Sequence, residues 1–326
     1  MANFTLNNVI RLIALIILLG VAVYIYFLST SEDSAELKEK ISLLSINNLI
    51  IPITLSLISY LLRFIRWRLI LKQLGHKLSI KNDLICYLSG FALTMTPGKS
   101  GETIRSAFLL QAQVPFQTSL SAFILERSFD LLIVGLIATL LIFAPFVTLL
   151  LFLSALTTLS FIGSRLADQK HDAHKINLPS FLLRLLHMIS RASIALKPKP
   201  IATYALLGFA AWGAQGLGFY YIVCLFTQDI ALLNAISTYC AALFIGAASL
   251  IPGGIGVTEG SLSWLLQTQG LDQNSAILSA LISRGCTLWL AVAIGCSALT
   301  VIIKGQSFPL QKKPEQISNY ENPEGS

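Results

Sequence analysis

The chain has 326 residues, of which 55% are hydrophobic and only 12% are charged, and its formal net charge is +7. An average soluble domain carries about 25% charged residues, so this composition and the mean hydropathy of +0.73 exclude an ordinary soluble protein. Several apolar runs reach the roughly 20 residues that span a bilayer, which predicts an all-α, polytopic membrane protein. The basic residues gather between these runs, which indicates membrane topology and contact with anionic headgroups rather than nucleic-acid binding.

Two spans are predicted at the N-terminal end, over residues 8–29 and 45–62. The segment between them is acidic and the second span is followed by a basic cluster. The positive-inside rule therefore places this cluster in a cytoplasmic loop. Its members are Arg63, Arg66, Arg68, Lys72, Lys77 and Lys81.

The next apolar run, residues 83–96, is too short to cross a membrane. Pro97 and Gly98 break the helix there, and Gly101 leaves the backbone free to turn. We therefore predict a broken hairpin, in which one half-helix descends to this turn and residues 102–113 climb back to the cytoplasmic side.

The middle of the chain returns to the cytoplasm. Residues 117–143 predict a full span, residues 146–164 a linker span, and residues 165–200 a cytoplasmic segment. Within that segment, residues 181–196 predict either a helix lying in the membrane interface or a surface helix packed on the bundle.

A second broken hairpin is predicted nearer the C-terminus, again around a Pro-Gly turn. In chain order it comprises a span over 201–226, a half-helix over 232–250, the turn Pro252–Gly254, a half-helix over 258–270 and a span over 275–303 that contains Arg284. Residues 306–326 have too little apolar surface to fold and predict a disordered cytoplasmic tail. Residues 1–305 are thus predicted as one membrane domain.

The two hairpins start on opposite sides of the membrane in this topology. Residues 45–143 and 201–303 are therefore predicted as two inverted repeats, an architecture typical of transporters whose discontinuous helices meet near the midplane. The basic segments place both termini in the cytoplasm of a multi-pass protein of the cell membrane.

Irregular backbone at membrane depth is tolerated where it is buried in protein or lines a watery cavity, so the two turns predict a site. A half-helix N-terminus attracts anions, and the arginine fork matches phosphate oxygens. The predicted lipid-phosphate or substrate ligands are Pro97, Gly98, Lys99, Ser100, Gly101, Glu102, Arg105, Arg127, Pro252, Gly253, Gly254, Gly256, Glu259 and Arg284. Glu126 and Asp130 would orient the arginines or carry a coupling proton. Alternatively, all these charges are structural ion pairs that hold the broken helices together.

Enzyme motifs are not found in the sequence. A P-loop would need glycine where Leu93 stands, and the five cysteines lie in apolar segments without a Cys-x-x-Cys pair. We therefore expect no metal, no cofactor and no catalytic residues.

Three motifs carry a family resemblance: Pro97-Gly98-x-x-Gly101-Glu102-x-x-Arg105, Glu126-Arg127-x-x-Asp130, and Pro252-Gly253-Gly254-x-Gly256-x-x-Glu259. With these motifs the chain resembles the lysylphosphatidylglycerol synthase transmembrane, or flippase-like, family. The resemblance covers nearly all of the chain before the tail. Bifunctional members carry a large soluble domain that aminoacylates phosphatidylglycerol, whereas only a short polar tail follows Ile303 here. The resemblance thus implies a stand-alone member that does not transfer lysine.

The expected function is translocation of an anionic lipid, phospho- or polyprenyl-phosphate-linked, across the cytoplasmic membrane. Its partners would be the bilayer, the lipid and a lipid-modifying enzyme. Two alternatives stay open: a membrane partner that presents lipid to a synthase, and a component of an integral-membrane glycosyl or aminoacyl transferase. Arg284 has no acidic residue within a helical turn, so it is predicted as the more direct lipid ligand and Arg127 as the more structural arginine.

Overall fold

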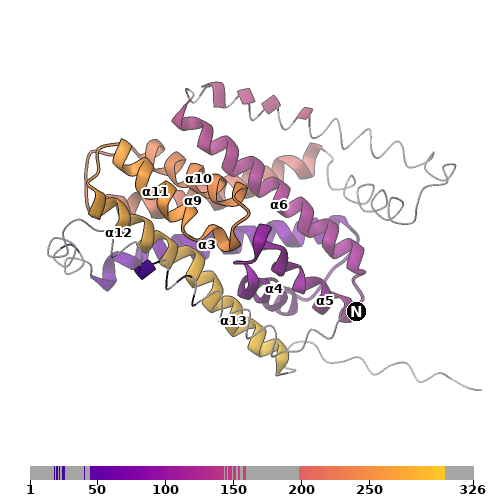
Figure 1. Ribbon diagram of the computed structural model, residues 1–326. Helices are drawn as coiled ribbons and strands as arrows, with labels where there is room; N and C mark the ends of the chain where they lie inside the picture. Colours follow the sequence, from indigo (N-terminus) through magenta and orange to yellow (C-terminus); the bar gives the residue numbers. More distant parts are fainter. Residues whose placement is uncertain are drawn as a thin grey trace, which may run out of the picture.

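The computed structural model describes residues 45–142 and 198–304, together with isolated positions from 18 to 40 and from 144 to 158. The regular elements in this part of the chain are all helices (Figure 1). The predicted spans 8–29 and 146–164 lie mostly outside the described residues. The cytoplasmic segment up to position 197 and the tail 306–326 lie entirely outside them.

The first long helix, α3 (Ile46–Gln73), begins at Ser45, whose side chain accepts a hydrogen bond from the Asn47 amide. It continues well beyond position 62, where the predicted span ends. The first four members of the basic cluster therefore belong to this helix. The prediction of a loop is therefore wrong for Arg63, Arg66, Arg68 and Lys72. The helix tolerates Arg63 and Arg66 in its buried face because a carboxylate on another helix pairs with both.

The first broken hairpin turns where the sequence predicts it. Its elements are α4 (Ile80–Ser89), the 3-10 turns η1 (Gly90–Leu93) and η2 (Pro97–Thr103), and α5 (Ile104–Gln111), followed by α6 (Phe116–Ala138). Gly98 and Lys99 are both left-handed, with φ of 59° and 57°. A Cβ atom at Gly101 would lie 2.8 Å from the Leu93 carbonyl oxygen, so the close approach of these backbones requires glycine.

The second half repeats this order of elements. It comprises α9 (Pro198–Val223), α10 (Leu232–Ala248), the turn η6 (Pro252–Gly254), α11 (Val257–Thr268), α12 (Gln273–Arg284) and α13 (Leu290–Ile303). The last predicted span is interrupted by a π-helical turn, η7 (Gly285–Trp289), directly after Arg284. Single π turns of this kind are frequent at functional sites.

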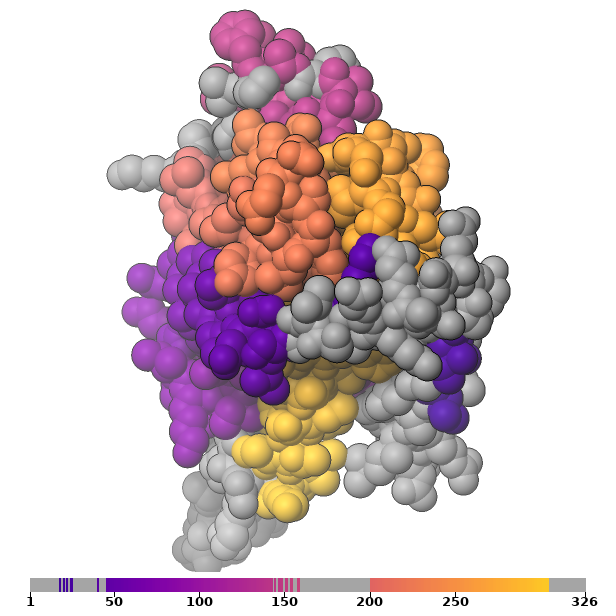
Figure 2. Space-filling view, turned by 90° about the vertical axis from the view of Figure 1, so that its left-hand side faces the viewer, coloured from indigo at the N-terminus to yellow at the C-terminus, as the bar shows by residue number. Residues whose placement is uncertain are grey.

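Helices of the first half pack on helices of the second half. Helix α3 packs along α9, α4 packs on α13, and α10 packs on α6, while the turns η2 and η6 touch each other (Figure 1). In the space-filling view of Figure 2, the orange and yellow second half lies against the indigo surface of α3. This reciprocal packing is what two related halves would give, and their inverted orientation stays a prediction.

The predicted class, an all-α polytopic membrane protein, is confirmed. Three helical stretches in the described part are long and apolar enough to cross a membrane, namely Ile46–Gln73, Pro200–Val223 and Gln273–Ile303. Large apolar side chains point outwards, such as Leu206 (69% exposed) and Trp264 (62% exposed). Such an apolar surface is stable in contact with the hydrocarbon of a bilayer but not in contact with water.

Candidate functional site

The two Pro-Gly turns enclose one cavity of about 260 Å³ between the two halves. Glycine at position 253 permits the contact between the turns, because a Cβ there would lie 3.3 Å from the Met95 side chain. The polar side chains that line the cavity are Tyr60, Arg63, Thr94, Thr96, Lys99, Arg127, Asp130, Trp212, Gln215, Tyr239, Thr258, Arg284 and Thr287.

Asp130 on α6 is the centre of the ion pairs at the cavity wall. Its carboxylate accepts a hydrogen bond from Arg66, and it lies 3.3 Å from Arg63 Nη2 and 3.1 Å from Arg127 Nη2. The Trp212 indole N–H donates a further bond to it at 3.1 Å. One carboxylate thereby holds α3, α6 and α9 together, because Arg63 and Arg66 come from α3 and Trp212 from α9.

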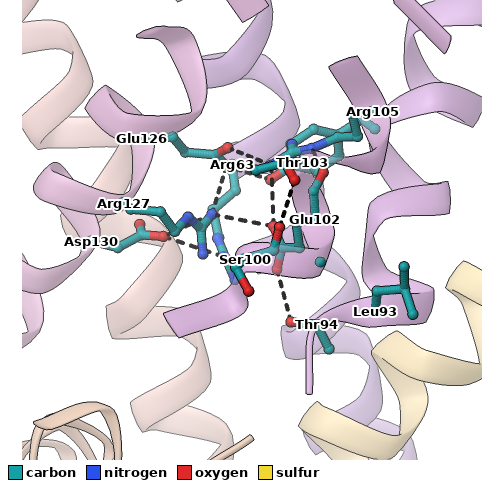
Figure 3. A network of polar contacts seen from close by, with 12 residues as sticks. Arg63, Leu93, Thr94, Ser100, Glu102, Thr103, Arg105, Glu126, Arg127 and Asp130 are labelled. Atoms are coloured by element: carbon teal, nitrogen blue, oxygen red, sulfur yellow. Dashed lines mark hydrogen bonds and ion pairs between the residues drawn. The ribbon is translucent and has the colours of Figure 1, made fainter. Parts of the chain in front are cut away.

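Behind this wall, Arg105 bridges the two glutamates. Its Nη2 lies 3.1 Å from Glu102 Oε2 and 3.2 Å from Glu126 Oε2. Thr94 donates a 2.8 Å hydrogen bond to Glu102, and Tyr87 donates a 2.7 Å bond to Glu126. Figure 3 shows the Glu102 carboxylate between Thr94 and the guanidinium groups. This group of side chains fixes the first turn to α6.

Aromatic rings surround the Arg105 guanidinium. Its central carbon lies 4.4 Å from the centre of the Trp67 ring and 4.8 Å from that of Tyr87. A Cβ at Gly90 would lie 3.1 Å from this arginine, so the small residue leaves room for it. Arg105 is therefore a buried cation held by carboxylates and π faces rather than a group facing the cavity.

The second turn has its own ion pair. Arg284 Nε lies 3.0 Å from Glu259 Oε1, and its Nη2 donates to the Gly253 carbonyl at 2.5 Å. The other oxygen of Glu259 accepts the Gly256 N–H at 2.7 Å. The N-terminus of α11, predicted as an anion site, is thus capped by a carboxylate of the chain itself.

Lys99 differs from the other cations. It lies in the left-handed backbone region, with φ of 57°. Among the described residues its ammonium has no ion pair or hydrogen bond, and its contact is with the Trp212 ring, whose centre is 5.9 Å away.

The predicted site residues divide into two groups. Those that line the cavity are Gly98, Lys99, Arg127, Asp130, Gly253, Gly254 and Arg284. Those placed outside its lining are Pro97, Ser100, Gly101, Glu102, Arg105, Glu126, Pro252, Gly256 and Glu259. Pro97 and Ser100 are exposed. No group of three or more metal-ligating side chains occurs in the described part of the chain.

Arg63, Trp212 and Gln215 line the cavity but were not predicted. A signal for Arg63 is present, because Ser56, Ser59 and Arg63 recur at helical spacing and form one polar face of α3. Trp212 and Gln215 are spaced in the same way on α9.

Part of the cavity wall is apolar. It is formed by Leu131 and Val134 of α6, Leu243 and Phe244 of α10, and Ile251 before the second turn. Leu131 and Phe244 are 49% and 43% exposed, so this wall reaches the outer surface where hydrocarbon would lie. The cavity therefore combines a cationic base with an apolar side.

Fold and cavity together define a helical membrane protein with a charged site between two broken hairpins. The chain belongs to the family described as the lysylphosphatidylglycerol synthase TM region, whose sequence profile matches residues 11–295. The family resemblance predicted from the three motifs is thereby confirmed.

Several membrane proteins are similar to segments of the chain. A UPF0104 membrane protein of Methanothermobacter thermautotrophicus is 26% identical over 111 residues, which are 34% of this chain and 33% of that protein. One from Pyrococcus horikoshii is 28% identical over 102 residues, 31% of this chain and 30% of that protein. One from Methanocaldococcus jannaschii is 24% identical over 129 residues, 39% and 55% of the two lengths. The matches thus span about a third of the first two relatives.

Proposed function

We propose that this protein binds an anionic lipid, phospho- or polyprenyl-phosphate-linked, and translocates it across the cytoplasmic membrane. The observation that carries the proposal is the shape and charge of the cavity between the two turns. Arg63, Lys99 and Arg127 line its cationic base, whereas Leu131 and Phe244 form a wall that reaches the surface. A headgroup phosphate fits the first part and a hydrocarbon chain fits the second.

The place of the cavity supports translocation rather than binding alone. It lies where the two broken hairpins meet, with one turn from each half in its lining. Movement of one half against the other would open such a site to either side, as in transporters with discontinuous helices. The cell-membrane location, with both termini in the cytoplasm, stays the prediction made from the basic segments.

A role in binding is favoured over catalysis by the state of the carboxylates. Glu102, Glu126, Asp130 and Glu259 are each engaged by at least one arginine. A general base would need to be free to take a proton. The two competing functions, presentation of lipid to a separate enzyme and group transfer within the membrane, make different predictions in the same assay.

Purified protein in liposomes is expected to move a fluorescent anionic phospholipid between leaflets without any other protein. The readout is the fraction of label that a membrane-impermeant reductant destroys with time. Arg63→Gln is expected to lower the rate at least about tenfold, because it removes a cation from the cavity base. Arg68→Gln is the matched control on the same helix, since Arg68 pairs with Asp83 outside the cavity.

Three results would contradict this function. Movement only after a lipid-modifying enzyme is added would indicate presentation, and appearance of a new lipid product would indicate transfer. If the label moves between leaflets equally fast in protein-free liposomes, the protein does not translocate the lipid.

A further inference from the structure

The buried charges around the cavity do not balance. The ion-pair network on the first-hairpin side contains four arginines, Arg63, Arg66, Arg105 and Arg127, and three carboxylates, Glu102, Glu126 and Asp130. Lys99 lies beside this network as a fifth cation without an ion pair to a described residue. Two further ion pairs, Arg284 with Glu259 and Arg68 with Asp83, each add one charge of either sign. Among these named groups the excess is therefore two positive charges.

This excess is concentrated at the cavity. Asp130 is the one carboxylate among its described lining residues, and it is shared by three arginines. Charged groups taken out of water are destabilising unless an opposite charge compensates them. A ligand with two negative charges would neutralise the site.

Two arginines of the lining also have unused donors. Arg63 Nε and Arg127 Nε are buried and donate no hydrogen bond to a described residue. Both side chains belong to the cavity lining. A phosphate oxygen accepts this kind of charge-assisted bond.

Lys99 reaches the cationic base of the cavity from a strained backbone conformation. A non-glycine residue in the left-handed region is strained, and Lys99 follows Gly98, which has the same conformation. Strain of this kind persists where a function requires the geometry. The side chain is aligned beside Trp212 without a carboxylate of its own.

We infer that the headgroup bound between the turns carries two negative charges, as in a phosphate monoester or a diphosphate, rather than the single charge of a phosphodiester. This inference rests on the proposed function and names its substrate class. Lys99, with Arg63 and Arg127, would hold the second charge.

The test compares two lipids with identical acyl chains: phosphatidic acid, a phosphate monoester, and phosphatidylglycerol, a phosphodiester. Their binding to the detergent-solubilised protein is measured at pH 7, where a monoester is mostly a dianion because its second pKa is near 6. We expect phosphatidic acid to bind at least about tenfold tighter, which corresponds to roughly 1.4 kcal/mol.

Lys99→Gly is expected to reduce this preference to about twofold or less while the thermal midpoint stays the same or rises. Glycine adopts the left-handed conformation without strain, so the turn keeps its shape. Lys77→Gly is the control, because Lys77 is an exposed loop lysine outside the cavity. If Lys99→Gly does not fold, Lys99→Asn replaces it, since asparagine also tolerates this region.

Inorganic pyrophosphate serves as the lipid-free probe. We expect it to compete with phosphatidic acid only at a much higher concentration, because it leaves the apolar wall unfilled. If pyrophosphate binds as tightly as phosphatidic acid, the ligand is a soluble anion and the lipid function fails while the charge inference stands. If the wild-type protein binds both lipids equally, or if Lys99→Gly weakens both equally, the charge inference is overturned while lipid translocation stands.

Discussion

Asp130→Ala is expected to lower the free energy of unfolding by about 3–5 kcal/mol, the usual cost of removing one partner from a buried ion pair. Asp130 is the carboxylate shared by Arg63, Arg66 and Arg127, and its loss leaves three buried guanidinium groups with less compensation. The measurement is the unfolding midpoint in mixed micelles at increasing denaturing detergent.

Asp229→Ala is the control for this variant, because Asp229 lies exposed in the connection before α10. Substitutions at such sites usually change stability by at most about 0.5 kcal/mol. Arg66→Gln in the Asp130→Ala background is expected to recover part of the loss, since it removes one uncompensated cation. If the Asp130→Ala variant unfolds at the same detergent concentration as the Asp229→Ala variant, Asp130 does not hold α3 to α6.

Arg284→Gln is expected to lower both lipid transport and the thermal midpoint. The sequence predicted this arginine as the more direct lipid ligand and Arg127 as the more structural one, but the structure pairs Arg284 with Glu259 and the Gly253 carbonyl. Its removal leaves Glu259, which is 1% exposed, without its cation. The expected destabilisation is again about 3–5 kcal/mol, read from unfolding in mixed micelles.

The double variant Glu259→Gln/Arg284→Gln separates the two roles. It removes both charges, so most of the stability is expected to return. Transport is expected to stay low, because Arg284 also lines the cavity and holds the second turn through Gly253. If transport returns together with stability, Arg284 acts only as the partner of Glu259.

The helical class and the position of both turns could be predicted from the sequence because they depend on local covalent properties. Proline lacks an N–H and glycine tolerates positive φ, so Pro97–Gly98 and Pro252–Gly253 interrupt a helix wherever they occur. Apolar run length likewise reports membrane spans without knowledge of the partners.

The end of α3 could not be predicted in this way. Arg63 and Arg66 read as the start of a cytoplasmic loop, because charges normally mark the end of a span. Their burial depends on Asp130, which lies 67 and 64 residues further along the chain. The same holds for the cavity, whose lining combines Arg63 from α3 with Trp212 from α9. Such pairings arise only when the helices pack.

The separation of predicted ligands into two groups has the same cause. The charged residues near the turns are alike in sequence, and only packing decides which of them face the cavity. Arg105 is enclosed by Trp67 and Tyr87, whereas Arg127 from the next helix reaches the cavity. The alternative that the charges hold the broken helices together therefore describes Arg105 well.

The most direct test of the central claim is an experimental structure of the protein in lipid nanodiscs made from an anionic lipid. We predict a headgroup phosphate between the two Pro-Gly turns, within hydrogen-bonding distance of Arg63 or Arg127, and an acyl chain along Leu131 and Phe244. A structure in which lipid is seen only on the outer surface, while the cavity between the turns is closed by protein side chains, would contradict the account.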